Sequence, residues 1–271
     1  MAWVAGLEGS GEKNHKMLVD SHAHLDMKDF DEDRSKVLER AKRGGITHIV
    51  TIGTDLDSSS AALDLARKYD FIYSAIGYHP HNADECTPKA LDELTQIASE
   101  QKVVAWGEIG LDYYRGYSSP DEQLKMFLRQ LEIAHDLNLP VIIHDREAHS
   151  DVLKILKKMG KGERKGVIHC FSGGTDLALA LIELGYYISI PGTVTYKKAS
   201  QIKDVATSLP LQCILVETDA PFLAPVPKRG KRNEPLFVTF TAQEIARLRG
   251  IEFAEVALQT SKNTKTLFGI P

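Results

Sequence analysis

Short apolar segments alternate with longer amphipathic ones along this 271-residue sequence, and this alternation limits the folds open to it. Eight apolar or β-branched runs have the length and composition of buried strands. They span residues 18–22, 48–53, 72–77, 103–109, 140–144, 166–170, 187–190 and 213–217. Apolar residues at helical spacing fill the intervals and indicate helices at 31–42, 58–68, 88–100, 120–137, 148–158, 176–184, 199–208, 234–249 and 253–267. The sequence therefore predicts an α/β protein.

Several helix ends carry local signals. Thr87 and Ser119 each precede a proline, which places a hydroxyl N-cap before proline in the first helical position. Gly44, Gly160 and Gly185 follow helical patterns and suit the left-handed conformation that ends many helices.

Eight strand–helix units match the roughly 250 residues of a typical (β/α)8 TIM barrel. A doubly wound open sheet has the same alternation, but it often carries a Gly-rich phosphate turn, and no G-x-G-x-x-G follows any of these strands. We therefore expect one TIM-barrel domain over residues 17–271. Residues 1–16 have no periodicity, and we expect a flexible N-terminal extension or the remnant of a tag.

Composition excludes several classes of protein. The net charge of −4 argues against binding nucleic acid by bulk positive charge. No run approaches the roughly 18 apolar residues of a membrane span, and no signal peptide is recognisable, so we expect a cytoplasmic protein without a membrane or an obligate protein partner. Three widely spaced cysteines indicate neither a disulfide framework nor a cysteine zinc site.

Ligand-type side chains gather at the predicted carboxyl ends of the strands, where TIM barrels build their active sites. These are His22, His24, Glu108, His144, His169, Glu217 and Asp219. His22 and His24 alternate on an extended strand and so point to one side. A lone His-x-His pair is equally compatible with ordinary hydrogen bonding. Four imidazoles with two carboxylates, however, are hard to explain by core packing.

Such a set exceeds the three protein ligands of a typical catalytic zinc site, so two metals fit better. Glu108, with two oxygens, is the natural bridge between ions about 3.5–4 Å apart. A pair of this kind can activate water and stabilise a displacement at phosphorus. The implied chemistry is hydrolysis.

At these residues the sequence resembles the TatD family of metal-dependent deoxyribonucleases. The similarity runs from about Met17 to Phe268 and rests on ordered motifs: VDSHAHL at 19–25, GYHPH at 77–81, GEIGLDYY at 107–114, His144, HCFSG at 169–173 and ETDAP at 217–221. The resemblance implies a TIM-barrel hydrolase that is related to the amidohydrolase superfamily. It also implies that this hydrolase degrades DNA, often from the 3′ end toward the 5′ end.

The resemblance also implies roles for single residues. His22, His24 and Asp219 would hold one metal, His144 and His169 the other, and Glu108 would bridge them. Asp219 would in addition deprotonate the attacking water, and His79 would contact the phosphate. Glu217 is expected to orient a histidine ligand, and His81 to be structural or to lie at the rim.

Basic and aromatic residues follow the same strands. The candidate substrate-binding residues are Arg115, Arg146, Lys197, Lys198, Lys228, Arg229, Lys231 and Arg232, with Tyr113, Tyr114 and Phe222 as possible stacking surfaces for bases. A solvated loop charge or a pocket wall is the alternative interpretation for each of them.

The leading hypothesis is hydrolysis of DNA, or of RNA, at single-stranded or frayed ends by water activated by two divalent ions, with Mg²⁺, Mn²⁺ and Zn²⁺ as candidates. Hydrolysis of a small ester, lactone or amide, or of an aminoacyl-tRNA ester, is the alternative. A non-enzymatic metal-binding protein is a third possibility, although a structural zinc site normally closes with four ligands.

Overall fold

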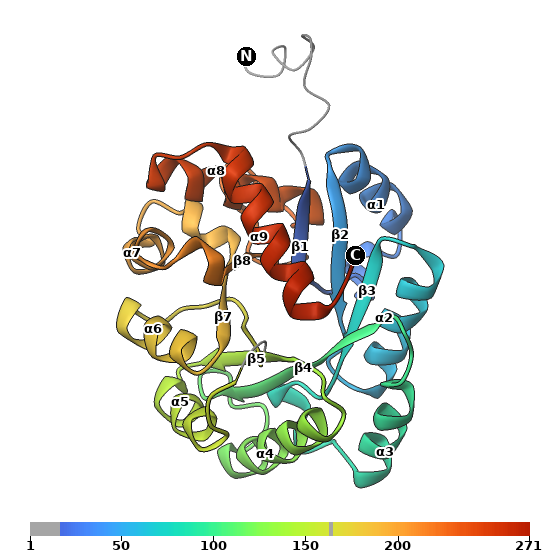
Figure 1. Ribbon diagram of the computed structural model, residues 1–271. Helices are drawn as coiled ribbons and strands as arrows, with labels where there is room; N and C mark the ends of the chain where they lie inside the picture. The colour runs from blue at the N-terminus through green and yellow to red at the C-terminus, as the bar shows by residue number, and fades with distance from the viewer. Residues whose placement is uncertain (1–16, 163–164) are drawn as a thin grey trace.

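The computed structural model describes residues 17–162 and 165–271, so the predicted N-terminal extension lies outside the described residues. Eight parallel strands follow one another around a nearly closed barrel in sequence order (Figure 1). They are β1 (Leu18–Ala23), β2 (Ile46–Ile52), β3 (Ile72–Ile76), β4 (Val103–Asp112), β5 (Val141–Arg146), β6 (Gly166–Ile168), β7 (Tyr186–Ile190) and β8 (Ile214–Val216). A bridge between Ala23 and Ala220 brings the first and last strands together. The predicted TIM barrel is confirmed.

Helices surround the barrel (Figure 1). They are α1 (Arg34–Arg43), α2 (Leu56–Lys68), α3 (Pro88–Ile97), α4 (Pro120–Asp136), α5 (His149–Lys158), α6 (Thr175–Glu183), α7 (Ser200–Ser208), α8 (Val238–Arg249) and α9 (Phe253–Phe268). Short 3-10 turns are η1 (Lys28–Phe30), η2 (Pro80–Asn82), η3 (Gly192–Thr195), η4 (Leu211–Cys213) and η5 (Pro235–Phe237).

The predicted helix signals are largely confirmed. The Thr87 and Ser119 side chains accept hydrogen bonds from the first turns of α3 and α4, and Gly160 and Gly185 have positive φ. The prediction for Gly44 was wrong. Gly44 keeps a right-handed helical φ of −78°, and the next residue, Gly45, makes the left-handed turn with φ 90°.

β4 is longer than predicted, because it continues past Ile109 to Asp112 along β5. Glu108 therefore lies inside the strand rather than at its end. Gly110 makes this possible, since a side chain at that position would collide with the backbone carbonyl of His144.

Apolar side chains fill the barrel interior. Val50, Val104 and Ile142 belong to a buried cluster that also contains Leu267 and Phe268 at the end of α9. The polar residues of the opposite, carboxyl end of the strands thus rest on a packed apolar layer. Among the described residues, no helix is long and apolar enough to cross a membrane.

Candidate metal centre

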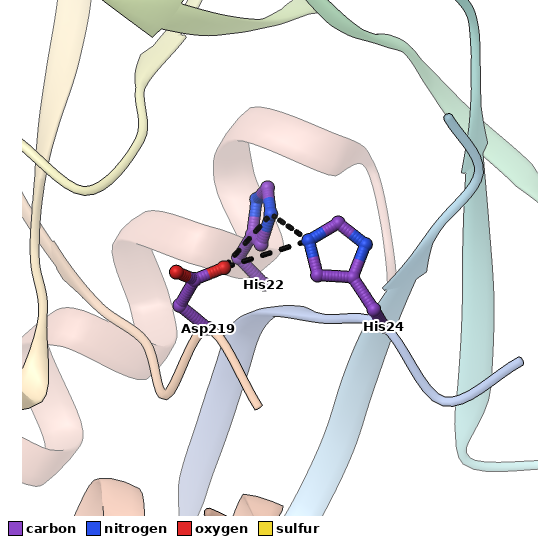
Figure 2. A group of neighbouring side chains, drawn as sticks. All are labelled: His22, His24 and Asp219. Atoms are coloured by element: carbon purple, nitrogen blue, oxygen red, sulfur yellow. Dashed lines mark hydrogen bonds and ion pairs between the residues drawn. The ribbon is translucent and has the colours of Figure 1, made fainter. Parts of the chain in front are cut away.

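The first ligand group combines residues from the first and the last strand of the barrel. β1 carries His22, and His24 follows the strand, while Asp219 lies just beyond β8 in a left-handed conformation with φ 57°. The backbone N–H of Asp219 donates to the His22 carbonyl at 2.9 Å, and that of His24 donates to the Ala220 carbonyl at 2.8 Å. These backbone bonds fix the segments so that the three side chains point toward one another (Figure 2).

The ligand atoms of this group converge. His22 Nε2 lies 3.3 Å from His24 Nε2, and Asp219 Oδ1 lies 3.7 Å from the first and 3.5 Å from the second. All three residues are buried. The geometry allows them to hold one cation.

A second group lies next to it. Oε1 of Glu108 is 2.7 Å from both His144 Nδ1 and His169 Nε2, and these two ring nitrogens are 3.3 Å apart. The other oxygen of Glu108, Oε2, lies 3.3 Å from His22 Nε2 and 3.7 Å from His24 Nε2. The Glu108 carboxylate therefore presents one oxygen to each group.

The outer nitrogens of three of these imidazoles face oxygen acceptors. His24 Nδ1 lies 3.3 Å from the Ile52 carbonyl, His144 Nε2 lies 3.2 Å from Asp112 Oδ2, and His169 Nδ1 lies 3.5 Å from Glu217 Oε1. Each acceptor favours a proton on the outer nitrogen, which leaves a lone pair on the nitrogen that faces the centre. Carboxylates and carbonyls behind metal-binding histidines have this function in metalloproteins.

Asp112 had no role in the sequence interpretation. It lies four residues after Glu108 on β4 and is fully buried. Its Oδ2 also faces His81 Nε2 at 2.7 Å, and its Oδ1 accepts hydrogen bonds from the N–H groups of Tyr114 and Arg115. The available signal was the spacing, because residues at i and i+4 of a strand share a face.

Asp20 was also missed. Its carboxylate accepts hydrogen bonds from the backbone N–H groups of His22 and Thr218 and from the Thr218 hydroxyl, the last at 2.6 Å. Asp20 thereby ties β1 to the segment that carries Asp219. The signals in the sequence were a carboxylate two residues before His22 and its place within the motif at 19–25.

The carboxylates of the centre are held in their ionised form. Burial would raise the pKa of Glu108, but the surrounding imidazoles, His169 foremost, hold that pKa well below its usual value. Burial opposes ionisation of Asp219 as well, and the hydrogen bond with His24 lowers its pKa. Burial would lower the pKa of His169, yet Glu108 and Glu217 raise it well above its usual value. The negative charge that draws a proton to His169 would equally attract a divalent cation.

The donor set fits metal ions. Ring nitrogens of neutral histidines repel each other at 3.3 Å unless a proton or a cation lies between them. Moreover, Glu108 Oε2 is buried and accepts no hydrogen bond from the described part of the chain. Buried imidazoles and carboxylates are suitable ligands for Zn²⁺ or Mn²⁺, and the carboxylates also suit Mg²⁺.

The centre forms the floor of an open pocket of about 880 Å³. Arg115, Arg146 and Phe222 contribute to its walls. His79 lies there too, with Nε2 3.4 Å from Glu108 Oε1 and 3.3 Å from His144 Nδ1.

The other predicted substrate-binding residues have different surroundings. Tyr113 donates its hydroxyl hydrogen to Asp151 at 2.9 Å. Lys228 lies over the Phe237 ring and Arg229 over the Tyr196 ring. Arg232 is paired with Asp33 at 2.8 Å. None of these residues lines the pocket.

A TIM barrel with imidazoles and carboxylates gathered at the carboxyl ends of its strands is the architecture of a metal-dependent hydrolase. Comparison with known proteins makes the assignment more specific. Residues 19–269 match the family model described as TatD related DNase. The chain therefore belongs to the TatD family, whose members here include hydrolases acting on ester bonds.

Curated relatives agree with this assignment. The chain is 42% identical over 254 residues to the uncharacterized metal-dependent hydrolase YabD of Bacillus subtilis. This alignment covers 94% of this chain and 100% of the relative. It is 36% identical to the 3′-5′ ssDNA/RNA exonuclease TatD of Escherichia fergusonii, over 93% of this chain and 99% of the relative. Among solved structures, the TatD homologue YjjV from Escherichia coli superposes with a TM-score of 0.88 at 34% identity, covering 94% of this chain and 98% of that one.

Proposed function

We propose that the protein is a nuclease that hydrolyses phosphodiester bonds of DNA, as a 3′-to-5′ exonuclease on single-stranded or frayed ends, with two divalent ions. The observation that carries this proposal is the Glu108 carboxylate, with one oxygen toward His144 and His169 and the other toward His22 and His24. The name of the Escherichia fergusonii relative supports single-stranded DNA or RNA as substrate.

Each of the two groups of side chains would hold one divalent ion. His22, His24 and Asp219 would hold one ion, His144 and His169 the other, and Glu108 would contact both. Bound divalent ions lower the pKa of water and stabilise negative charge on a phosphoryl oxygen. The Mg²⁺, Mn²⁺ and Zn²⁺ ions are the candidates.

Two side chains would then handle protons and charge. Asp219 is ionised and lies at the pocket floor, so its carboxylate would accept the proton of the attacking water as a general base. Burial lowers the pKa of His79 to about 4, so the ring is neutral at pH 7. Because His79 Nδ1 accepts a hydrogen bond from the His81 N–H, its proton lies on Nε2, from which it can donate to a phosphate oxygen.

The test uses oligonucleotides labelled at the 5′ or the 3′ end, with Mg²⁺ or Mn²⁺. The wild type should shorten single-stranded DNA stepwise from the 3′ end, and Glu108→Ala and Asp219→Ala proteins with native circular dichroism should lose about 10³-fold or more of this rate. Wild-type rates in the folded variants would refute the proposal. Faster turnover of a lactone or of charged tRNA would favour the alternative ester hydrolase.

A further inference from the structure

Two arginines at the pocket wall beside His144 have no carboxylate partner within ion-pair distance among residues 17–162 and 165–271. They are Arg115, in the loop after β4, and Arg146, at the end of β5. The guanidinium carbon of Arg146 lies 4.1 Å from the centre of the Tyr114 ring, and that of Arg115 lies 5.9 Å from it. Tyr114 is 62% exposed, so this arrangement faces solvent at the mouth of the pocket.

These arginines differ from those that hold the structure together. Arg40 and Arg232 are neutralised by Glu234 and Asp33 at 2.6 and 2.8 Å. Within the described residues, Arg115 and Arg146 have no such ion pair, so their positive charge can act on a ligand in the pocket. Both line the pocket whose floor carries the carboxylates of the metal centre. A guanidinium donates hydrogen bonds in its own plane, so a contact with a ring face does not use up these donors. The matching ligand is a phosphate or another oxyanion.

The backbone sets the position of this pair relative to the metal centre. His144 and Arg146 are two apart on β5, so both side chains leave the same face of the strand, roughly 7 Å apart at the backbone. That separation is comparable with the spacing of successive phosphates along a nucleic acid strand. Asp112 pairs with Arg146 in register, and its carboxylate accepts the N–H groups of Tyr114 and Arg115. One buried residue thus aligns both the His144 ring and the arginine loop.

We propose that Arg115 and Arg146 form a subsite for the phosphate next to the scissile one. The inference rests on the proposed function and deepens it, because the substrate then needs one phosphate more than the bond that is cleaved. Such a subsite selects oligonucleotides over small uncharged esters. Tyr114 holds the Arg146 guanidinium in place at low entropic cost.

The experiment compares three dinucleotides with one phosphodiester bond each: one without a terminal phosphate, one with a 5′-phosphate and one with a 3′-phosphate. The two phosphorylated forms distinguish on which side of the scissile bond the subsite lies. One of them should show a kcat/KM about 10- to 100-fold above the unphosphorylated compound, mainly through KM, since a charge-assisted contact has about this effect. This ratio should fall toward one in Arg115→Gln and Arg146→Gln, and it should persist in Arg129→Gln, an exposed arginine on α4.

A binding measurement keeps the subsite testable apart from turnover. Fluorescent versions of the same dinucleotides are titrated into each protein, and the terminal phosphate should strengthen binding to the wild type but not to Arg146→Gln. The subsite would be overturned if the wild type bound and cleaved all three dinucleotides equally well. It would also be overturned if both arginine variants kept the wild-type preference for the phosphorylated dinucleotide. If neither the dinucleotides nor the end-labelled oligonucleotides are cleaved, while Arg146→Gln removes phosphate-dependent binding, the subsite would be supported and the nuclease refuted.

Discussion

The Asp112 carboxylate lies 3.2 Å from Nε2 of His144, on the side of the ring opposite the nitrogen that faces Glu108. Burial opposes ionisation of Asp112, but hydrogen bonds with His144, Arg115 and His81 lower its pKa. A permanently ionised acceptor behind the ring fixes both its tautomer and its orientation. Asp112 therefore controls a ligand without touching the centre itself.

Asp112→Asn should lower metal affinity by about 10- to 100-fold, as loss of a partner behind a metal-binding histidine typically does. The asparagine oxygen can still accept the N–H groups of Tyr114 and Arg115, so the fold should persist. Titration calorimetry with Mn²⁺ measures the affinity, and Asp136→Asn, at the exposed end of α4, is the matched control. Unchanged affinity in Asp112→Asn would remove Asp112 from the metal-binding machinery.

The basic loop after β8 should divide into structural and substrate-binding residues. Arg232 donates to the Asp29 carbonyl and the Asp33 carboxylate, which ties this loop to the start of α1. Arg229 has no carboxylate partner in the described ranges. We expect Arg232→Ala to lower the Tm by a few degrees and to leave the salt dependence of DNA binding unchanged. Arg229→Ala should instead reduce the slope of log K against log salt by about 0.7.

Fluorescence anisotropy over a salt series, with Asp219→Asn in the background to prevent cleavage, measures these slopes, and thermal unfolding measures the Tm. A shallower slope in Arg232→Ala with an unchanged Tm would reverse the assignment. The result would then return Arg232 to the phosphate-binding residues that the sequence predicted.

His48, near the amino end of β2, should make stability depend on pH. Burial, with Lys265 and Lys102 nearby, lowers its pKa to about 4 from the usual 6.5. Between these values the unfolded chain binds more protons than the folded one, so stability falls as the pH falls from 6.5 to 4. After allowance for solvent screening, His48 should account for a loss of about 1 kcal/mol in the free energy of unfolding over this range. Urea unfolding at both ends of this range should show a smaller loss in His48→Gln than in wild type, whereas His135→Gln, exposed on α4, should match the wild type. Equal losses in all three proteins would exclude this role for His48.

The sequence predicted the barrel because its eight strands alternate with helices that signal their own ends, as at Thr87 and Ser119. It also placed the imidazoles and carboxylates of the centre in one pocket, since strand ends of a barrel meet on one face. The extent of β4 was missed because Gly110 resembles a strand terminator, whereas it serves close packing against His144. Asp112 and Asp20 were missed because their roles depend on partners from other strands, and a single sequence does not specify such contacts.

Divalent ions should stabilise the protein by an amount that grows with the logarithm of their concentration above the Kd. The ring nitrogens and carboxylate oxygens of the centre converge on one another, with separations such as the 2.7 Å between His169 Nε2 and Glu108 Oε1. Little rearrangement is therefore needed on binding, and the full binding free energy stabilises the fold. At 100 times the Kd this amounts to about 2.7 kcal/mol, which EDTA should reverse.

Binding should also release protons. Glu108 and Glu217 raise the pKa of His169 above its usual value, so a proton competes with a cation for this ring. The Tm increase on adding Mn²⁺ should therefore be larger at pH 8 than at pH 6, and calorimetry in buffers of different ionisation enthalpy should detect the protons. Asp219→Asn should show a much smaller Tm increase than wild type, while His48→Gln, a histidine outside the centre, should retain it. A Tm that does not respond to Mn²⁺, Mg²⁺ or Zn²⁺ in the wild type would contradict a metal centre built from these side chains.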